Sequence, residues 1–254
     1  MAINPWQVAT NPVSGFYYLA MVNTTVPPFD NKLVRQALSF AVDRQRFTST
    51  TLGGVFEPRG LPWPKHAPAY DAAKSAARGF DLDKARSLLA QAGVSNFDLE
   101  INYQSANAET SGLAQIIQPD LEKIGAKVVL RGLEDLTWRD QNQKVAYKGL
   151  SLALGGLAGI ESSSLFTNSS FWNPLTGSTG FRSDRYVQLL NAVTSEPDSS
   201  KRRDLYNQLN DFLLDESFVI SVSGTAPIAA LRPSVRGLKH TVHEAILYTD
   251  VWLA

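Results

Sequence analysis

The chain has 254 residues, of which 44% are hydrophobic and 19% charged, so it can form a real core and is not generally disordered. Lys plus Arg and Asp plus Glu number 24 each, and the resulting formal charge of zero gives no electrostatic basis for binding DNA, RNA or an anionic membrane. The absence of cysteine excludes disulfide scaffolds, cysteine nucleophiles and thiolate metal sites.

The first predicted element is a strand over Phe16 to Val22, a short aromatic and β-branched run that two prolines end. No charged residue precedes Asp30, and the segment before the strand lacks the basic region and apolar core of a signal peptide. We therefore expect the chain to begin inside a longer protein. The longest apolar run, Gly149 to Ile160, is too short to cross a bilayer, which takes about 20 residues.

A helix is predicted after a cap at Asp30 or Asn31, because apolar residues recur at helical spacing from Val34 to Val42. Residues 53–70 have no periodicity and are rich in glycine and proline, which predicts a long loop. Loops of this length in compact domains are usually functional or disordered. Three side chains within it can line a pocket: Trp63, His66 and Tyr70.

A second helix, over 81–93, precedes a predicted β-α-β unit. Its strands are Leu99 to Tyr103 and Lys127 to Leu130, and the helix between them contains Ile116. Strands joined by such a crossover are parallel neighbours.

Another helix is predicted over 133–145, and a second long loop, rich in small polar residues, over 155–183. Two helices follow, with apolar stripes over 186–193 and 205–213, and the chain from residue 225 is β-like or irregular. This order predicts an α/β fold, a three-layer mixed sheet with helices on both faces. Four strands are expected in that sheet: Leu99–Tyr103, Lys127–Leu130, Leu150–Leu154 and Phe218–Val222.

The sequence contains no recognisable motif for catalysis or for a cofactor. It lacks a Walker A motif, a G-x-S-x-G elbow and a dinucleotide glycine fingerprint. His240 and His243 are three residues apart on an expected strand, so they point to opposite faces and do not favour a shared metal ion. We expect no enzyme activity, no catalytic residue, no cofactor and no metal.

Four aromatic residues lie in predicted loops or at helix edges, away from core spacing: Trp63, Trp138, Phe171 and Trp172. One interpretation is that they fill the core or staple loops. The other is that loops on one face present aromatic walls to a small ligand.

The segment from Pro27 to Arg44, PPFDNKLVRQALSFAVDR, resembles the signature of the family 5 extracellular solute-binding proteins, the peptide-, nickel- and opine-binding receptors of ABC importers. Further segments agree with that family in the same order: Gly53-Gly54, Phe80–Gly93, Leu121–Val128, Arg202–Tyr206 and Val251–Leu253. Family members are longer and hold their ligand between two lobes. The resemblance therefore implies that this chain is the C-terminal lobe of a two-lobed (type II) periplasmic-binding-protein fold.

The resemblance also implies a division of the chain. Residues 1–25 would be the incoming strand and hinge from the missing N-terminal lobe, residues 26–223 the second ligand-binding lobe, and residues 224–254 a tail that returns to the first lobe. The two crossings are expected side by side, at Asn23 to Pro28 and at Val219 to Gly224. An unpartnered tail exposes apolar surface and strand edges, so we expect self-association of the isolated lobe and weak binding of its ligand.

One departure from the family concerns the ligand. In many peptide binders a W-x-A-D-Y-P-D-P stretch supplies an aspartate that pairs with the peptide's α-amino group, and Gly159 stands at that position here. The ligand therefore differs, or Glu161 supplies the charge. Arg182 can meet an acidic or hydroxyl-rich ligand, or be an ordinary surface arginine. The expected ligand contacts are Trp63, Trp138, Glu161, Trp172 and Arg182.

The resemblance implies a non-catalytic solute-binding component of an ABC importer at the periplasmic or extracellular face of the cell membrane. It would bind a peptide-like or other small polar ligand by closing two lobes, and would present the closed form to permease subunits. The alternative is the effector-binding domain of a cytoplasmic transcriptional regulator with the same fold. The DNA-binding segment would then precede this chain, which itself is not expected to contact nucleic acid.

Overall fold

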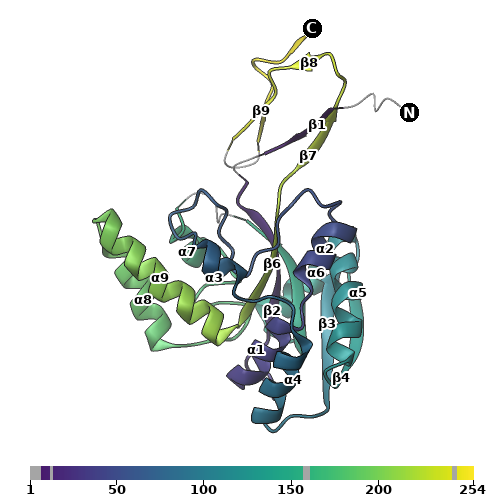
Figure 1. Ribbon diagram of the computed structural model, residues 1–254, viewed down its shortest axis with the longest axis vertical. Helices are drawn as coiled ribbons and strands as arrows, with labels where there is room; N and C mark the ends of the chain where they lie inside the picture. Colours follow the sequence, from purple (N-terminus) through teal and green to yellow (C-terminus); the bar gives the residue numbers. More distant parts are fainter. Residues whose placement is uncertain (1–6, 12–13, 157–160, 242–244) are drawn as a thin grey trace.

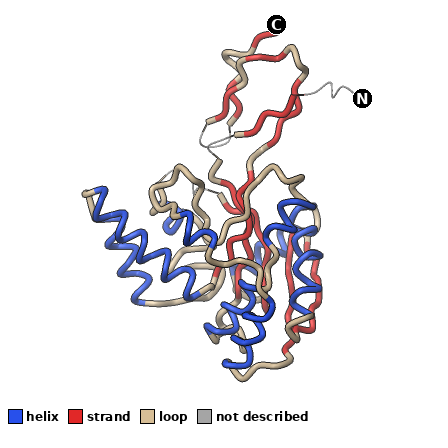
Figure 2. The backbone as a smooth tube through the Cα atoms, in the orientation of Figure 1, coloured by secondary structure: helices blue, strands red, loops and turns tan. Residues whose placement is uncertain are grey.

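The computed structural model describes residues 7–11, 14–156, 161–241 and 245–254. They form an α/β lobe from which a narrow projection of short strands extends (Figures 1 and 2). The lobe is built on a five-stranded sheet of order β4-β3-β5-β2-β6. These strands are β2 (Phe16–Val22), β3 (Phe97–Gln104), β4 (Ala126–Leu133), β5 (Gly149–Gly155) and β6 (Val219–Thr225).

The predicted β-α-β unit is confirmed. β3 pairs in parallel with β4 along its whole length, and α5 (Ala108–Glu122) connects the two strands. β3 is also parallel to β5, whereas β2 runs antiparallel to β5 and β6, so the sheet is mixed as expected. All four strands that the sequence predicts for one sheet belong to it.

Helices cover both faces of the sheet, which confirms the three-layer architecture. The core on one face involves α1 (Lys32–Phe40), α2 (Arg44–Thr50), α4 (Leu82–Gln91) and α5. The core on the other face involves α6 (Asp135–Gln143), α7 (Ser164–Asn168), α8 (Asp184–Ser195) and α9 (Ser199–Glu216). The short α7 lies in a segment that the sequence predicts to be loop, and α3 (Ala72–Ala76) follows the first long loop in a stretch with no predicted element.

β2 lies in the middle of the lobe and serves both cores. Tyr18 and Ala20 point into the first core and Tyr17 and Leu19 into the second, as the alternation of a strand requires. Six of the seven residues of β2 are buried. The predicted boundary at residue 25 is therefore too late, because the strand before it is part of the lobe's own sheet.

The predicted pair of crossings is also wrong. Val219–Gly224 pairs with the strand segment Tyr17–Met21, whereas Asn23 follows the far end of β2, where its amide N–H donates to Gly149 O. The chain instead leaves the lobe at the other end of these strands, where Phe16 pairs with Thr225. The antiparallel pairing explains this, since it places the beginning of β2 beside the end of β6. The proline-rich turn after β2 is a loop within the lobe.

The projection consists of three two-stranded ribbons that lie outside both cores (Figure 1). They pair β1 (Gln7–Thr10) with β7 (Ile228–Leu231), β8 (Val235–Arg236) with β11 (Trp252–Leu253), and β9 (Lys239–His240) with β10 (Ile246–Leu247). Neither core cluster contains a described residue after Val222. Ile228, Trp252 and Leu253 are more than half exposed.

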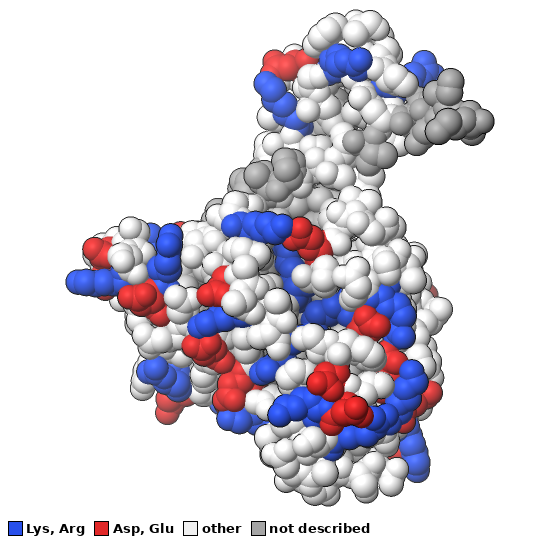
Figure 3. All heavy atoms as spheres, in the orientation of Figure 1, with Lys and Arg blue, Asp and Glu red and all other residues white. Residues whose placement is uncertain are grey.

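None of the helices in the described ranges has both the length and the apolar content that a membrane crossing would need. Acidic and basic side chains are mixed over the face shown in Figure 3.

Candidate functional site

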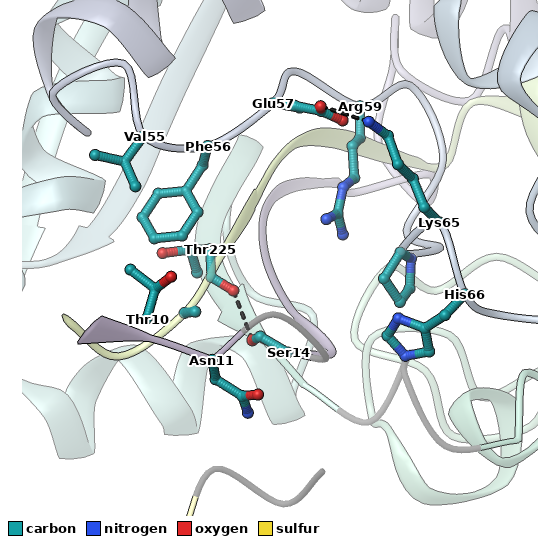
Figure 4. A pocket seen from close by; sticks show the side chains of 12 residues that line it. Thr10, Asn11, Ser14, Val55, Phe56, Glu57, Arg59, Lys65, His66 and Thr225 are labelled. Atoms are coloured by element: carbon teal, nitrogen blue, oxygen red, sulfur yellow. Dashed lines mark hydrogen bonds and ion pairs between the residues drawn. The ribbon is translucent and has the colours of Figure 1, made fainter. Parts of the chain in front are cut away.

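A cavity of about 360 Å³ lies where the projection leaves the lobe (Figure 4). Three parts of the chain line it: Thr10, Asn11 and Ser14 at the end of β1 and beyond it, residues of the loop over 55–66, and Thr225 with Ala226. This loop belongs to the stretch 53–70, whose length predicts that it is either functional or disordered. The two crossing strands thus form one side of the cavity and the loop forms the other.

The loop is fixed to the end of β6 by backbone contacts. Gly224 N–H donates to Glu57 O at 3.2 Å, and Arg59 N–H donates to Val222 O at 2.9 Å. Between them, Pro58 forms a bridge with Ser223. The loop therefore continues the sheet beyond β6 for a short distance, which holds the side chains of Glu57 and Arg59 over the crossing.

Arg59 is the central cation of this cavity. Its side chain points into the space between the loop and Ser14 (Figure 4). A Cβ at position 224 would lie 2.3 Å from Arg59 Cζ, so only glycine allows the guanidinium group to lie against β6. Its Nη1 is buried and has no hydrogen-bond partner among the residues that the structure describes.

The nearby carboxylate does not neutralise Arg59. Glu57 Oε1 instead accepts a hydrogen bond from Lys65 Nζ at 2.5 Å. Burial lowers the pKa of Arg59, and the charge of Glu57 opposes that shift. Among the described residues Arg59 thus forms no ion pair, and Glu57 acts on it only through its charge.

Of the three loop residues that the sequence analysis names as pocket candidates, two line cavities and one is buried. His66 lines the cavity, and Tyr70 lines two neighbouring ones. Trp63 is fully buried, and its Nε1–H donates to Asn210 Oδ1 at 2.7 Å.

The tryptophans do not form an open wall in this structure. Trp63, Trp138 and Trp172 are 0%, 6% and 1% exposed and belong to the core between the sheet and α8 and α9. Trp172 Nε1–H donates to Tyr17 Oη at 2.7 Å. The second interpretation, aromatic walls facing a ligand, is not the arrangement found, because this face of the sheet uses the large rings as packing.

Glu161 and Arg182 are engaged locally. Tyr206 Oη donates to Glu161 Oε1 at 2.5 Å. The pKa of Tyr206 is raised, mainly because the phenol is buried and secondly because of this hydrogen bond and the charge of Glu161. Arg182 is exposed, and its Nη1 donates to the carbonyl of the adjacent Phe181 at 2.7 Å. Gly159, the position of the family aspartate, lies outside the described residues, as does His243.

Two of the five expected contact residues therefore come together, through Tyr206. Trp63 packs on the Tyr206 ring at a centroid distance of 6.4 Å, and Glu161 accepts the Tyr206 hydroxyl. Trp138 lies in the same core cluster as Trp63, and Arg182 donates to the carbonyl of Phe181 instead. Contact of any of the five with a ligand stays a prediction.

Sequence reasoning missed Arg59, Glu57 and Lys65. Each is a single charged residue in a loop and follows no periodic pattern. The one available signal was the length of the loop that carries them. In the described part of the chain, no group of three or more His, Asp or Glu side chains is placed to hold a metal ion.

Comparison with known proteins gives a consistent picture. A profile described as bacterial extracellular solute-binding proteins, family 5 middle, matches residues 3–178. The glutathione-binding protein GsiB of Shigella flexneri is 30% identical over 213 residues, which cover 79% of this chain and 40% of that protein. Heme-binding protein A of Haemophilus influenzae is 28% identical over 233 residues, covering 87% and 41%.

Solved structures show the same fold. HbpA2 from Haemophilus parasuis has a TM-score of 0.84 and 23% identity, and the match covers 99% of this chain and 50% of that one. A dipeptide-binding protein from Pseudoalteromonas, in complex with Met-Leu, has a TM-score of 0.82 and 20% identity, covering 99% and 51%. The chain thus spans about half the length of these structures and about two fifths of the curated relatives.

Proposed function

The chain belongs to the family 5 bacterial extracellular solute-binding proteins, and from this we propose that it acts as one ligand-binding lobe of such a receptor. The receptor would be the non-catalytic solute-binding component of an ABC importer, at the periplasmic or extracellular face of the membrane. The family match, over residues 3–178, carries the proposal. The description of that family as extracellular solute-binding proteins favours the importer over the effector domain of a cytoplasmic regulator.

The arrangement of the crossing supports a site between two lobes. The cavity beside Arg59 is lined by residues from both strands that leave the lobe. In a two-lobed receptor, closure rotates the lobes about such strands and shifts the population toward the form that a permease recognises. The partners of this chain would then be the missing first lobe and the permease subunits.

The ligand would be peptide-like or another small polar molecule. The relatives are named for glutathione and heme, and one structural neighbour holds the dipeptide Met-Leu. Arg59 supports a ligand with a negatively charged group, because its buried Nη1 has no partner among the described residues.

The test is a ligand screen by thermal shift and calorimetry, run in parallel on this chain and on a two-lobed protein that contains it. Peptides, glutathione, heme, oligosaccharides and metal chelates form the panel. We expect a hit to bind the two-lobed protein tightly and this chain weakly, because one lobe covers only part of a ligand's surface. Equal affinity for both proteins would contradict the two-lobe proposal.

A further inference from the structure

A second cavity, of about 310 Å³, lies beside the first one and is lined by three arginines: Arg44, Arg59 and Arg78. It is bounded by the start of α2, by α3 and by the loop that carries Arg59. Arg59 lines both cavities. Figure 3 shows basic side chains near the centre of this face of the lobe.

None of these three arginines forms an ion pair with a carboxylate of the described residues. Arg44, which is 5% exposed, donates to the carbonyls of Ser221, at 2.8 Å, and of Arg78, at 2.8 Å. Carbonyl oxygens satisfy hydrogen bonds but carry only partial charges. Three full positive charges thus meet at one cavity in a chain whose net charge is zero.

Two N–H groups of these arginines have no acceptor in the described part of the chain. Arg78 donates from Nη2 to Leu214 O at 2.6 Å and lies over the Phe40 ring, but its Nε is buried without a partner. Arg59 Nη1 is in the same condition. A buried donor without an acceptor costs stability, and a buried cationic donor costs more.

The acidic residue of the cavity is already occupied. Asp43 caps α2 by accepting from Arg46 N–H at 2.9 Å, and its other oxygen lies 3.9 Å from Arg46 Nε. Burial lowers the pKa of Arg44 to about 9, and the charge of Arg78 adds to that shift. The Asp43 carboxylate is thus held by its own helix, and the positive charges of Arg44 and Arg78 act on each other.

We propose that this cavity is an oxyanion site that binds a carboxylate or phosphate group. Arg59 and Arg78 supply the hydrogen-bond donors. Arg44, whose guanidinium group donates to carbonyls of the protein, contributes its positive charge. A guanidinium group suits such oxyanions because its N–H groups match two oxygens at once. The oxyanion is either a free ion or the acidic end of a solute held at the adjoining crossing, and only the second source rests on the proposed function.

The experiment uses this chain and measures thermal shift and calorimetry with sodium phosphate and sodium acetate, against sodium chloride at equal ionic strength. We expect both oxyanions to raise the melting temperature beyond the effect of chloride. Arg59→Gln and Arg78→Gln should each weaken binding by about tenfold or more, because each removes a charge-assisted hydrogen bond. Arg139→Gln, at an exposed arginine paired with Asp135, is the matched control and should bind as the unmodified chain does.

Circular dichroism and melting without added oxyanion check that each variant folds. Should Arg78→Gln fail to fold, Arg59→Gln and the calorimetry of the unmodified chain decide the matter. Equal responses to phosphate, acetate and chloride in the unmodified chain would overturn the proposal. So would an unchanged response in Arg59→Gln.

A second arm separates the two sources. The dipeptide Ala-Ala and its C-terminal amide are tested for competition with phosphate. Competition by the free acid alone assigns the site to the acidic end of a solute, and phosphate binding without such competition assigns it to a free ion. If phosphate binds as expected but the two-lobed protein binds no compound of the ligand panel, the transport proposal fails and the oxyanion site stands.

Discussion

Trp63 is held by contacts that only an indole can make. Its Nε1–H donates to Asn210 Oδ1, and Asn210 Nδ2 donates in turn to Ala69 O at 2.8 Å. The ring also packs edge-on against Phe166 at a centroid distance of 5.8 Å. These contacts tie the long loop to α9, so the loop's path toward the cavity depends on this side chain.

We therefore expect Trp63→Phe to lower the free energy of unfolding by about 2 kcal/mol or more, since it leaves a void and a buried Asn210 oxygen without its donor. Urea unfolding measures the loss. Trp252→Phe is the matched control at a position that is 58% exposed, and it should change stability by less than about 0.5 kcal/mol. Equal losses in the two variants would contradict the role assigned to the indole.

Gly224 offers a way to move Arg59 without removing its charge. We expect Gly224→Ala to displace the guanidinium group, because the new Cβ would meet Arg59 Cζ at 2.3 Å. The stability cost should be small, since the end of a flexible side chain can shift, whereas oxyanion affinity should fall. In a double-mutant cycle with Arg59→Gln the effect of Gly224→Ala on affinity should disappear, and additive effects would disprove the coupling.

Among the elements, α1 and α9 are joined by an ion pair that is largely shielded from water. Arg35 Nη2 lies 2.7 Å from Glu216 Oε2, and the two side chains are 3% and 21% exposed. Arg35 also donates to the carbonyls of Phe29 and Asp30 at the start of the helix. The pair connects helices that belong to opposite faces of the sheet.

Glu216→Gln should lower the free energy of unfolding by about 2–3 kcal/mol, because it leaves the Arg35 charge buried and uncompensated. Chemical denaturation measures the change. Asp83→Asn removes the acid of an exposed pair with Arg86, and its effect should be below about 1 kcal/mol. A result in which both variants cost the same would show that burial is not the deciding factor.

β2 places a tyrosine in each of the two cores. Burial raises the pKa of Tyr18 to about 12, and that of Tyr17 is raised as well. The same phenols in the unfolded chain ionise near pH 10. As the pH rises above 10, the unfolded chain releases protons that the folded chain keeps, so the free energy of unfolding should fall.

Melting temperatures between pH 8 and pH 11.5 test this. Tyr17→Phe should make the decline shallower, although it also removes the acceptor for Trp172 Nε1–H and lowers stability at neutral pH. Tyr248→Phe, at a tyrosine that is 66% exposed, serves as the control. A slope unchanged by Tyr17→Phe would contradict the assignment.

The sequence was sufficient for most helices and strands of the lobe and for the parallel pairing of β3 with β4. Helical and strand periodicities, caps such as Asn31, and the β-α-β pattern depend on neighbours along the chain, and each can be read locally. The crossing could not be read in this way, since it depends on β2 pairing with β6 from the other end of the chain. Arg59 was missed because its distinguishing feature is a buried N–H group without an acceptor among the described residues. Whether a side chain finds an acceptor depends on the folded structure and cannot be read from the sequence.

At the scale of the whole molecule, the projection exposes large apolar side chains at its end. Trp252 and Leu253 at its end are 58% and 74% exposed, and they belong to two-residue strands that pair only once. Such edges and patches favour pairing with another chain. In the proposed receptor the first lobe would cover them.

We expect light scattering to show self-association of this chain as its concentration rises, and Leu253→Ser to weaken it. Leu136→Ser, on α6 of the lobe at a position that is 80% exposed, is the control and should leave association unchanged. A strict monomer over the whole concentration range would refute this expectation.

The pairing of β2 with β6 also determines when the lobe can be completed during synthesis. Ser14 and Thr225, which meet beside this pairing, lie 211 positions apart in the sequence. Four strands of the sheet can assemble earlier, but β2 stays an open edge until β6 has left the ribosome. Contacts between such distant segments form slowly. The lobe therefore remains without a finished core while the residues between β2 and β6 are synthesised, and any factor that binds unfolded chains has that period in which to capture it.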